Sequence, residues 1–439
     1  MKLKIASAIA LMAGFGMFTS CKNEPILNPN APSMEDIVKN PTLSQLNSLV
    51  TGAESGMRNR METYTDVANV FGREYYRFSG ADPRWMDVLL GEDDLVPAAG
   101  GFYTSIPWDT RYNVVKNCNL LLQGVDKSVY VPNDKVKKGY MAFAKTIMAY
   151  QMLLILNGTH DNGIRLDVAD PYKPGPIVNR ATAMEAIATM LNEADGMLAD
   201  AEFRFTLSEG FAGFDDPANF RKFNRAIAAR VAVYREQWAN ALTYLQNSFL
   251  SLAPGANLNA GPKHIFSLAT GDQVNPLFLA PDNEDEIQMA HPSYITDMEA
   301  NDDRIGKARD RGAEFDIGGI KGRYEMRLYQ TQTDPISIIR NEELVLLFAE
   351  ASAQTNALPA AADAVNSIRT RHGITARADL DTKDKLINEI LKQRRFSLWG
   401  EGHRWIDMRR YNRLNQLPID RATDNIFAQL PIPLSESSK

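Results

Sequence analysis

Cysteine is almost absent from this chain: only Cys21 and Cys118 occur among 439 residues. Cys21 ends a leader-like N-terminal stretch, which leaves no second cysteine for an intramolecular disulfide, so we expect the packed core alone to hold the fold. The five histidines are scattered and show no zinc-ligand spacing. Acidic stretches near His160 and at Asp282–Glu286 lack the residue order of a calcium loop. The sequence therefore predicts no metal and no cofactor.

An excess of positive charge is also missing. The chain has 48 lysines and arginines against 54 aspartates and glutamates, for a formal net charge of −6 at pH 7. Nucleic-acid binding depends on clustered cations that neutralise phosphates, so this balance argues against a nucleic-acid partner. After residue 21, no apolar run approaches the roughly 20 residues of a membrane-spanning helix. We expect the mature chain to contact a membrane only through its N-terminus.

The first 21 residues have the pattern of an exported lipoprotein. Two lysines precede a mostly apolar run, Ile5–Phe18, which is about fourteen residues long and therefore typical of a signal-peptide core. The run ends in Thr-Ser-Cys, as at a site where a lipoprotein is cleaved and its cysteine lipidated. We predict a signal peptide at 1–20 and a lipidated tether at 21–40 that begins with acylated Cys21. Ordinary secretion with a free Cys21 is the alternative.

Apolar residues recur at steps of three and four along much of the chain, which is the period of an amphipathic helix. The clearest stripes cover residues 43–57, 108–122, 140–154, 184–198, 223–245, 344–351 and 387–398. Thr182 and Glu185 match a capping box at the start of the fourth stripe. Several stripes form pairs with small residues near the crossing, as in tetratricopeptide-like arrays, although a clean repeat of about 34 residues is not present. The pattern predicts a mainly α fold.

Two segments interrupt the helical pattern. Residues 251–335 contain eight glycines and six prolines, too many for long helices. Short runs within them, such as Asp285–Met289 and Arg323–Leu328, favour short strands or turns packed against the helices. Residues 157–179 form a second long loop. Because binding residues tend to lie on long ordered loops of a rigid scaffold, these segments are where we expect a ligand site.

One tryptophan, Trp85, lies outside both the helical stripes and the C-terminal segment, in the turn-rich loop Ser79–Trp85. An exposed aromatic ring can stack on the flat face of a sugar while charged groups bind the hydroxyls at its edge. Segment 73–87 is therefore the first candidate ligand site, and the loop region 255–300 is the second. The candidate ligand-binding residues are Arg73, Tyr75, Tyr76, Arg84, Trp85 and Asp87, with Tyr294 in the second region. Core packing of Trp85 is the alternative.

The segment Gln393–Arg410 has the composition of an active site, since Glu401, His403 and Asp407 lie among five arginines. A carboxylate beside a histidine can form a general base. The alternative is a buried ion network in which Arg394, Arg395, Arg404, Arg409 and Arg410 pair with these acids. Flanking apolar residues favour burial, and buried charges persist when they are paired. A glycosidase carboxylate pair is not excluded, because its members need only be close in space.

Several segments, in this order, resemble the SusD/RagB family of outer-membrane nutrient-binding lipoproteins. They are Arg340–Glu343 with the aliphatic run Leu344–Ala351, then Ala364–Gly373, Gln393–Arg410, and Leu430–Pro433 with Glu436. Gln393 and Ser397 stand where glutamates are frequent in the family. The resemblance implies that the signature residues tie the C-terminal helix into the fold; these are Arg340, Glu343, Arg394, Arg395, Glu401, Gly402, His403, Arg404, Trp405, Asp407 and Arg410.

The resemblance implies one SusD-like domain at 41–439: a tetratricopeptide-like helical array, a loop-rich insertion at about 251–335 and the signature region 336–439. It also implies a surface-exposed lipoprotein of the outer membrane, which is not an enzyme. Such a protein binds an oligosaccharide, or in some branches a peptide, and delivers it to a SusC-like TonB-dependent transporter. A glycoside hydrolase and a helical-repeat scaffold lipoprotein of the envelope are the alternative hypotheses.

Overall fold

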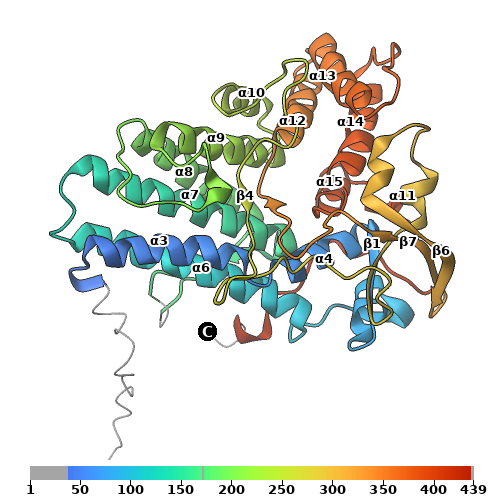
Figure 1. The fold of residues 1–439 in the computed structure, drawn as a ribbon, viewed down its shortest axis with the longest axis horizontal. Helices are drawn as coiled ribbons and strands as arrows, with labels where there is room; N and C mark the ends of the chain where they lie inside the picture. The colour runs from blue at the N-terminus through green and yellow to red at the C-terminus, as the bar shows by residue number, and fades with distance from the viewer. Residues whose placement is uncertain (1–37, 171–172, 437–439) are drawn as a thin grey trace, which may run out of the picture.

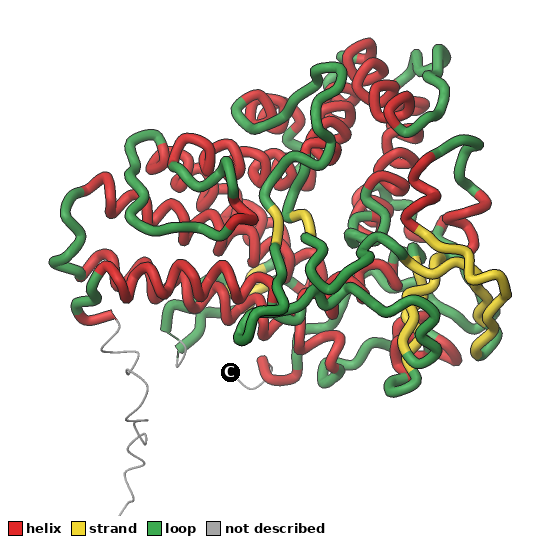
Figure 2. The backbone as a smooth tube through the Cα atoms, viewed as in Figure 1, coloured by secondary structure: helices red, strands yellow, loops and turns green. Residues whose placement is uncertain are grey.

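The computed structural model describes residues 38–170 and 173–436. Helices dominate, and loops and a few strands cover one side of them (Figures 1 and 2). The predicted signal peptide, Cys21 and most of the tether lie outside the described residues.

A row of helices forms the main body of the molecule, and each helix packs on its neighbours (Figure 1). The long ones are α3 (Leu43–Arg58), α4 (Met61–Phe71), α6 (Phe102–Lys127), α7 (Asp134–Thr159), α8 (Arg180–Leu198), α9 (Pro217–Tyr234), α10 (Trp238–Gln246), α12 (Asn341–Gln354), α13 (Leu358–Arg371) and α14 (Lys383–Ser397). Shorter helices are α5 (Asp87–Leu90), α11 (Pro292–Thr296) and α15 (Arg404–Arg410). The predicted mainly α, tetratricopeptide-like architecture is confirmed.

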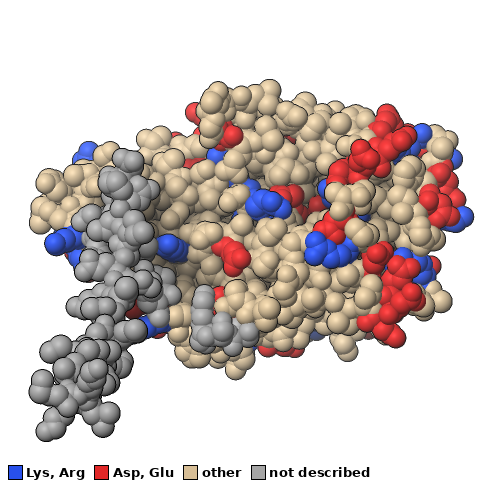
Figure 3. Space-filling view, turned by 90° about the horizontal axis from the view of Figure 1, so that it is seen from below, with Lys and Arg blue, Asp and Glu red and all other residues tan. Residues whose placement is uncertain are grey.

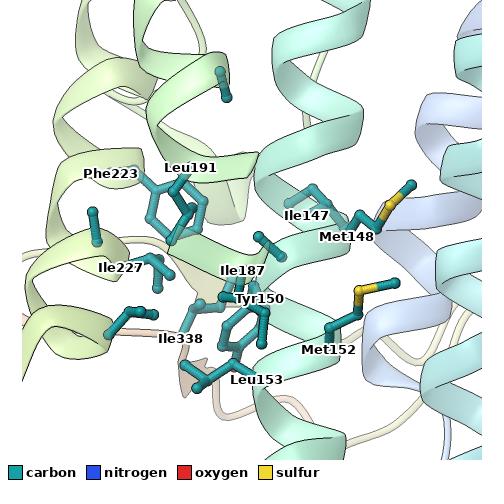
Figure 4. Close-up of a cluster of buried hydrophobic side chains, with 14 of the residues drawn as sticks. Ile147, Met148, Tyr150, Met152, Leu153, Ile187, Leu191, Phe223, Ile227 and Ile338 are labelled. Atoms are coloured by element: carbon teal, nitrogen blue, oxygen red, sulfur yellow. The ribbon is translucent and has the colours of Figure 1, made fainter. Parts of the chain in front are cut away.

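The apolar stripes of the sequence form the core between these helices. On α3, which packs on α6, the stripe residues Leu46, Val50, Ala53 and Met57 are buried and Leu43 is partly buried. The helix begins with a capping box formed by Thr42 and Gln45. Figure 4 shows the centre of the core, where Leu191 of α8 lies beside Phe223 of α9, and Leu153 of α7 lies beside Ile338. Burying several large side chains from each helix stabilises the array by roughly 1.5–3 kcal/mol per side chain.

Two helix boundaries differ from the sequence prediction. Helix α8 is capped by Asn179, whose side chain accepts a hydrogen bond from the Thr182 backbone N–H, so Thr182 lies inside the helix and is not its cap. The stripe 223–245 is two helices, because the chain turns between α9 and α10, where Glu236 adopts φ +57°. The stripe continues across the turn because both helices face the same core.

Helix α7 is more apolar than we expected from the sequence. Residues 134–162 are long and apolar enough to cross a membrane by length and composition, with a mean hydropathy of 1.3 in the best window. However, 83% of that window is buried inside the fold. A helix surrounded by other helices is apolar on all sides, so this is the central helix of the array.

Short strands form a small sheet at one end of the molecule. Its antiparallel strands are β1 (Tyr75–Ser79), β5 (Glu286–Ala290), β7 (Ile320–Met326) and β6 (Ala308–Ile317), in that order. Two-residue ladders join β2 (Ile164–Arg165) to β3 (Ile177–Val178), and β4 (Lys263–His264) to β8 (Ile336–Ser337). The expectation of short strands in the loop-rich segment 251–335 is confirmed. Acidic side chains gather at the end that carries the β6–β7 hairpin (Figure 3).

Single turns of 3-10 helix connect the larger elements. They are η1 (Pro83–Trp85), η2 (Glu92–Asp94), η3 (His160–Asn162), η4 (Glu209–Phe211), η5 (Asp303–Lys307), η6 (Leu414–Gln416) and η7 (Leu434–Glu436). Turn η5 directly precedes β6 and contributes several residues to the lining of an open groove.

Candidate functional site

The C-terminal signature segment is a tightly bonded corner between α14 and α15. Gly400 and Gly402 both adopt φ +80°, a left-handed conformation that glycine adopts without strain, so the chain can reverse there. Asn69 of α4 secures the turn, since its amide donates to the Gly400 carbonyl at 3.1 Å and its oxygen accepts from the Gly402 N–H at 3.1 Å. The Trp405 indole N–H donates to the Phe427 carbonyl at 2.8 Å. These bonds attach α15 to distant segments, as the family resemblance implies.

Buried ion pairs fill the space beneath this corner. The Asp407 carboxylate contacts Arg394 at 2.6 Å and Arg410 at 2.8 Å, and Arg410 also contacts Glu350 at 2.8 Å. On the neighbouring helix, Glu343 forms a two-bond pair with Arg230 at 2.6 and 2.7 Å. Removing one member of such a pair leaves an uncompensated charge in the interior.

The predicted network of five arginines is wrong in detail. Glu401 pairs with Arg340 at 2.8 Å and not with the arginines of its own segment. Arg395 pairs with Asp297 at 2.7 Å near the surface. Arg404 and Arg409 donate to the backbone carbonyls of Arg73 and Asn157, at 2.7 and 2.8 Å. Guanidinium groups can satisfy carbonyls as well as carboxylates, and spacing along a sequence does not distinguish the two.

The catalytic arrangement of Glu401, His403 and Asp407 is not formed. Both carboxylates bind arginines, and His403 lies in the interior, where burial lowers the pKa of its imidazole. Within the described part of the chain, the buried His403 Nδ1 has no hydrogen-bond partner, so no carboxylate orients this ring as a base. The corner therefore holds the fold together.

The aromatic ligand site predicted at 73–87 is wrong for its aromatic residues and for Arg73. Tyr75, Tyr76 and Arg73 are at most 1% exposed, because strand β1 is covered on both faces. Trp85 is 8% exposed and packs edge-on against Phe102 at 4.9 Å between ring centres. None of these rings presents a face to a sugar.

The three remaining candidate ligand-binding residues lie in different surroundings. Tyr294 is 1% exposed and stacks on Trp399 at 4.2 Å, so it belongs to the core. Arg84 is exposed beside that core, pairs with Asp82 at 2.6 Å and lies over the Phe102 ring. Asp87 is half-buried at the start of α5. Among the described residues, no exposed aromatic ring lies with these charged groups.

A large open groove lies elsewhere, between the end of α13, strand β4 and turn η5. Its volume is about 620 Å³, within the usual range for ligand pockets. Figure 2 shows the loops that approach one another in this central part of the molecule. The lining residues are Asn257, Leu258, Asn259, Lys263, Asp303, Arg304, Gly306, Lys307, Arg327, Leu328, Tyr329, Gln330, Pro335, Ser337, Arg340, Glu342, Arg371, His372 and Glu401. We call this surface the central groove.

Ion pairs with the signature residue Arg340 build the inner wall of the central groove. Arg340 binds both Glu342 and Glu401. His372 lies between two carboxylates, with its Nδ1 at 2.7 Å from Asp303 and its Nε2 at 2.7 Å from Glu342. Burial opposes the negative charge on Glu342, but Arg340 and His372 outweigh it and hold the pKa of that carboxyl well below its usual range.

Lys307 lies against the same wall. Burial, reinforced by the neighbouring charge of Arg340, lowers the pKa of its ammonium group to about 8. Its Nζ donates to the Phe396 carbonyl at 3.0 Å. Of the three carboxylates that line the groove, Glu342 and Glu401 are held by Arg340, and Asp303 contacts His372.

The outer lining of the central groove is polar. Asn257, Asn259, Gln330 and Ser337 present amides and a hydroxyl, which can donate to and accept from the hydroxyl groups of a sugar. The aromatic surface is small, since Tyr329 is 7% exposed. The groove is thus suited to polar contacts along a ligand rather than to stacking.

Further cavities include two that bear on the site. One of about 60 Å³ lies behind the central groove and shares Tyr329, Ser337 and Glu401 with it. Another of about 400 Å³ is lined by Trp108, Tyr112 and the Arg165–Glu436 ion pair. Across residues 38–170 and 173–436, no group of three or more His, Cys, Asp or Glu side chains could hold a metal ion.

The fold and the groove together define a class: a tetratricopeptide-like helical array with a C-terminal arginine-carboxylate corner and an open polar groove. The SusD family model matches residues 320–429, which contain the corner and part of the groove. A SusD superfamily protein from Bacteroides vulgatus is 16% identical with a TM-score of 0.69, and the match covers 90% of this chain and 96% of that chain. Residues 320–429 thus match the SusD family model, and the fold of the described chain is that of SusD-like proteins.

Two other solved structures are similar over 90% of this chain and 97% of theirs. A laminarin-binding SusD-like protein is 16% identical with a TM-score of 0.67. Surface glycan-binding protein A from Bacteroides thetaiotaomicron is 14% identical with a TM-score of 0.69. No curated protein matches the sequence.

Proposed function

We propose that this protein binds an oligosaccharide in the central groove. The observation that carries the proposal is the groove itself: a volume of about 620 Å³, lined by amides, a hydroxyl and charged groups on a rigid helical scaffold. Solved proteins with the same fold include a laminarin-binding protein and a surface glycan-binding protein, which supports a sugar as ligand. A peptide is the alternative ligand, as in some branches of the family.

We further propose that the protein is a lipoprotein of the outer membrane, surface-exposed, that delivers its ligand to a SusC-like TonB-dependent transporter. The leader ending at Cys21 and the polar stretch after it support an anchored domain held away from the membrane by a tether. The match to the SusD family model supports the transporter as partner. The proposed role is capture and delivery without chemistry.

The groove assignment can be tested by filling the groove. A Cβ added at Gly306 meets no atom within 4 Å, so Gly306→Trp places a large ring in the groove without displacing the backbone. We expect glycan binding, measured by calorimetry against a panel of plant and microbial oligosaccharides, to weaken at least tenfold, which is about 1.4 kcal/mol. The thermal midpoint should remain unchanged.

Gly196→Trp is the matched control, because Gly196 on α8 also meets no atom within 4 Å of an added Cβ and lies outside the groove. It should bind like the parent. Equal binding by both variants would place the ligand site elsewhere, for instance in the pocket at Trp108. Turnover of any panel member by the parent protein would favour the hydrolase hypothesis instead.

The anchor makes a separate prediction. Cys21→Ala removes the thiol that would carry the lipid, so the protein should move from the membrane fraction to the soluble fraction and lose palmitate labelling. Cys118→Ala is the control: this buried cysteine on α6 has no access to lipid, and its variant should stay with the membrane. Unchanged fractionation of Cys21→Ala would contradict lipid anchorage.

A further inference from the structure

The central groove is positively charged although the whole protein is negatively charged. Six lysines or arginines line it against three carboxylates. The chain as a whole carries a formal net charge of −6, and acidic side chains gather at the β6–β7 end of the molecule (Figure 3). A cationic surface that departs from the charge of the whole molecule indicates what the groove attracts.

Two of the three carboxylates do not neutralise the outer cations, because they are already paired on the inner wall. Arg340 binds Glu342 and Glu401, whereas Asp303 contacts His372 and keeps 66% of its side chain exposed. At most one carboxylate charge therefore faces the outer cations. Arg304 has its own partner, Asp302, at 2.6 Å.

Lys307 donates its Nζ hydrogen to the Phe396 carbonyl at 3.0 Å, so three cations remain for a ligand. Lys263 of β4, Arg327 just after β7 and Arg371 at the end of α13 all line the groove, and throughout 38–170 and 173–436 none of them forms an ion pair. Arg327 is partly buried, and its buried Nη1 has no hydrogen-bond partner in the described structure. The part of this guanidinium that faces the groove can bind an acidic group, because partial desolvation strengthens a charge-assisted hydrogen bond.

The three cations come from separate segments that meet only at the groove. Lys263 belongs to the two-residue ladder with β8, Arg327 leaves the sheet, and Arg371 ends a helix of the array. Acidic groups at more than one position along an extended ligand can therefore be bound at once. Arginine forks fit carboxylate and sulfate oxygens, whereas a neutral sugar would leave these charges uncompensated.

We propose that the oligosaccharide bound in the central groove is anionic, with uronic-acid carboxylates or sulfate esters that contact Lys263, Arg327 and Arg371. This inference rests on the proposed function and names the ligand class for that site. The amides of Asn257, Asn259 and Gln330 bind the hydroxyl groups of the same ligand.

Calorimetry on the full chain in detergent tests the proposal with matched pairs of probes. Oligogalacturonate is compared with its methyl ester, alginate oligosaccharides with neutral mannan oligosaccharides, and sulfated carrageenan oligosaccharides with desulfated ones. We expect at least one charged probe to bind at least tenfold more tightly than its neutral partner, and its affinity to fall as salt rises. The carboxylate and sulfate arms identify which acidic group is preferred.

Substitutions then test which cations bind the charged probe. Arg327→Gln and Arg371→Gln should each weaken binding of the charged probe about tenfold and leave the thermal midpoint unchanged. Lys127→Gln on α6 removes the same unit of charge at an exposed position outside the groove and should have no effect. Equal affinity for charged and neutral probes, or wild-type binding by both arginine variants, would overturn the anionic assignment and leave glycan binding intact. If Gly306→Trp binds the probes undiminished, the groove itself fails as the site.

Discussion

Replacing Glu343 by alanine is expected to lower the free energy of unfolding by about 3–5 kcal/mol, because it strands the Arg230 guanidinium in the interior. Both side chains are almost fully buried, and two hydrogen bonds of 2.6 and 2.7 Å join them. This guanidinium also donates to the Ile338 carbonyl at 3.1 Å, but a neutral carbonyl does not balance its charge. Urea unfolding followed by circular dichroism measures the loss.

Two variants isolate the cause. Glu314→Ala removes a carboxylate from an ion pair with Lys321 in which both side chains are 59% exposed, so its stability should change by less than about 0.5 kcal/mol. Arg230→Met combined with Glu343→Leu removes both charges and keeps the volume, so it should recover most of the loss. If Glu343→Ala is as stable as the parent, the pair is not a structural tie of the fold.

The same ion pair makes the free energy of unfolding depend on pH. Burial opposes ionisation of Glu343, but the Arg230 charge outweighs it and holds the pKa of the carboxyl at about 2, against 4.5 for the unconstrained group. A depressed pKa means that the folded state holds the proton less tightly, so this contribution is present above pH 4.5 and is lost as pH falls towards 2. Glu343→Ala should lack this part of the acid dependence, which unfolding curves from pH 5 to pH 2 will show.

Replacing Trp85 by alanine should also lower the free energy of unfolding by about 3–5 kcal/mol, as expected for truncating a buried tryptophan. Trp85 packs with Phe102 and Leu89 in the cluster around the sheet and is 8% exposed. Binding of any glycan by the fraction that remains folded should be unchanged, because Trp85 lies outside the central groove. Denaturant unfolding measures the first effect and calorimetry at low temperature the second.

Trp85→Phe is the control, since it keeps an aromatic ring in the cluster and should cost less than the alanine variant. A Trp85→Ala protein with parental stability and lost glycan binding would restore the ligand site predicted at 73–87.

Helices were predictable from this sequence because their signal is local. The stripe at 43–57 gave α3 within one residue of its ends. The turn between α9 and α10 gave no such signal, because the left-handed residue there is Glu236 and not a glycine. Tyr75 and Tyr76 were misassigned because a strand between helices and other strands buries both faces, which alternation alone does not reveal.

The central groove was not predictable by the same route. Its residues come from 257–263, 303–307, 327–342 and 371–372, with Glu401 as the last, and no spacing along the chain links them. Loop chemistry pointed to 251–335, and this segment supplies many of the residues that line the groove. It could not show that Arg371 and His372, at the end of a helix in the signature region, complete the site.

Arg340 divides the central groove into two parts that differ in how freely their residues can be substituted. The inner wall is fixed, because changing Arg340, Glu342 or Glu401 would disturb the corner that keeps the C-terminal helices in place. The outer rim at Asn259, Lys263 and Arg327 stands on loops and strand ends that bear little of the core. Substitutions at the rim alone could therefore change which ligand the groove accepts, while the helical scaffold stays the same.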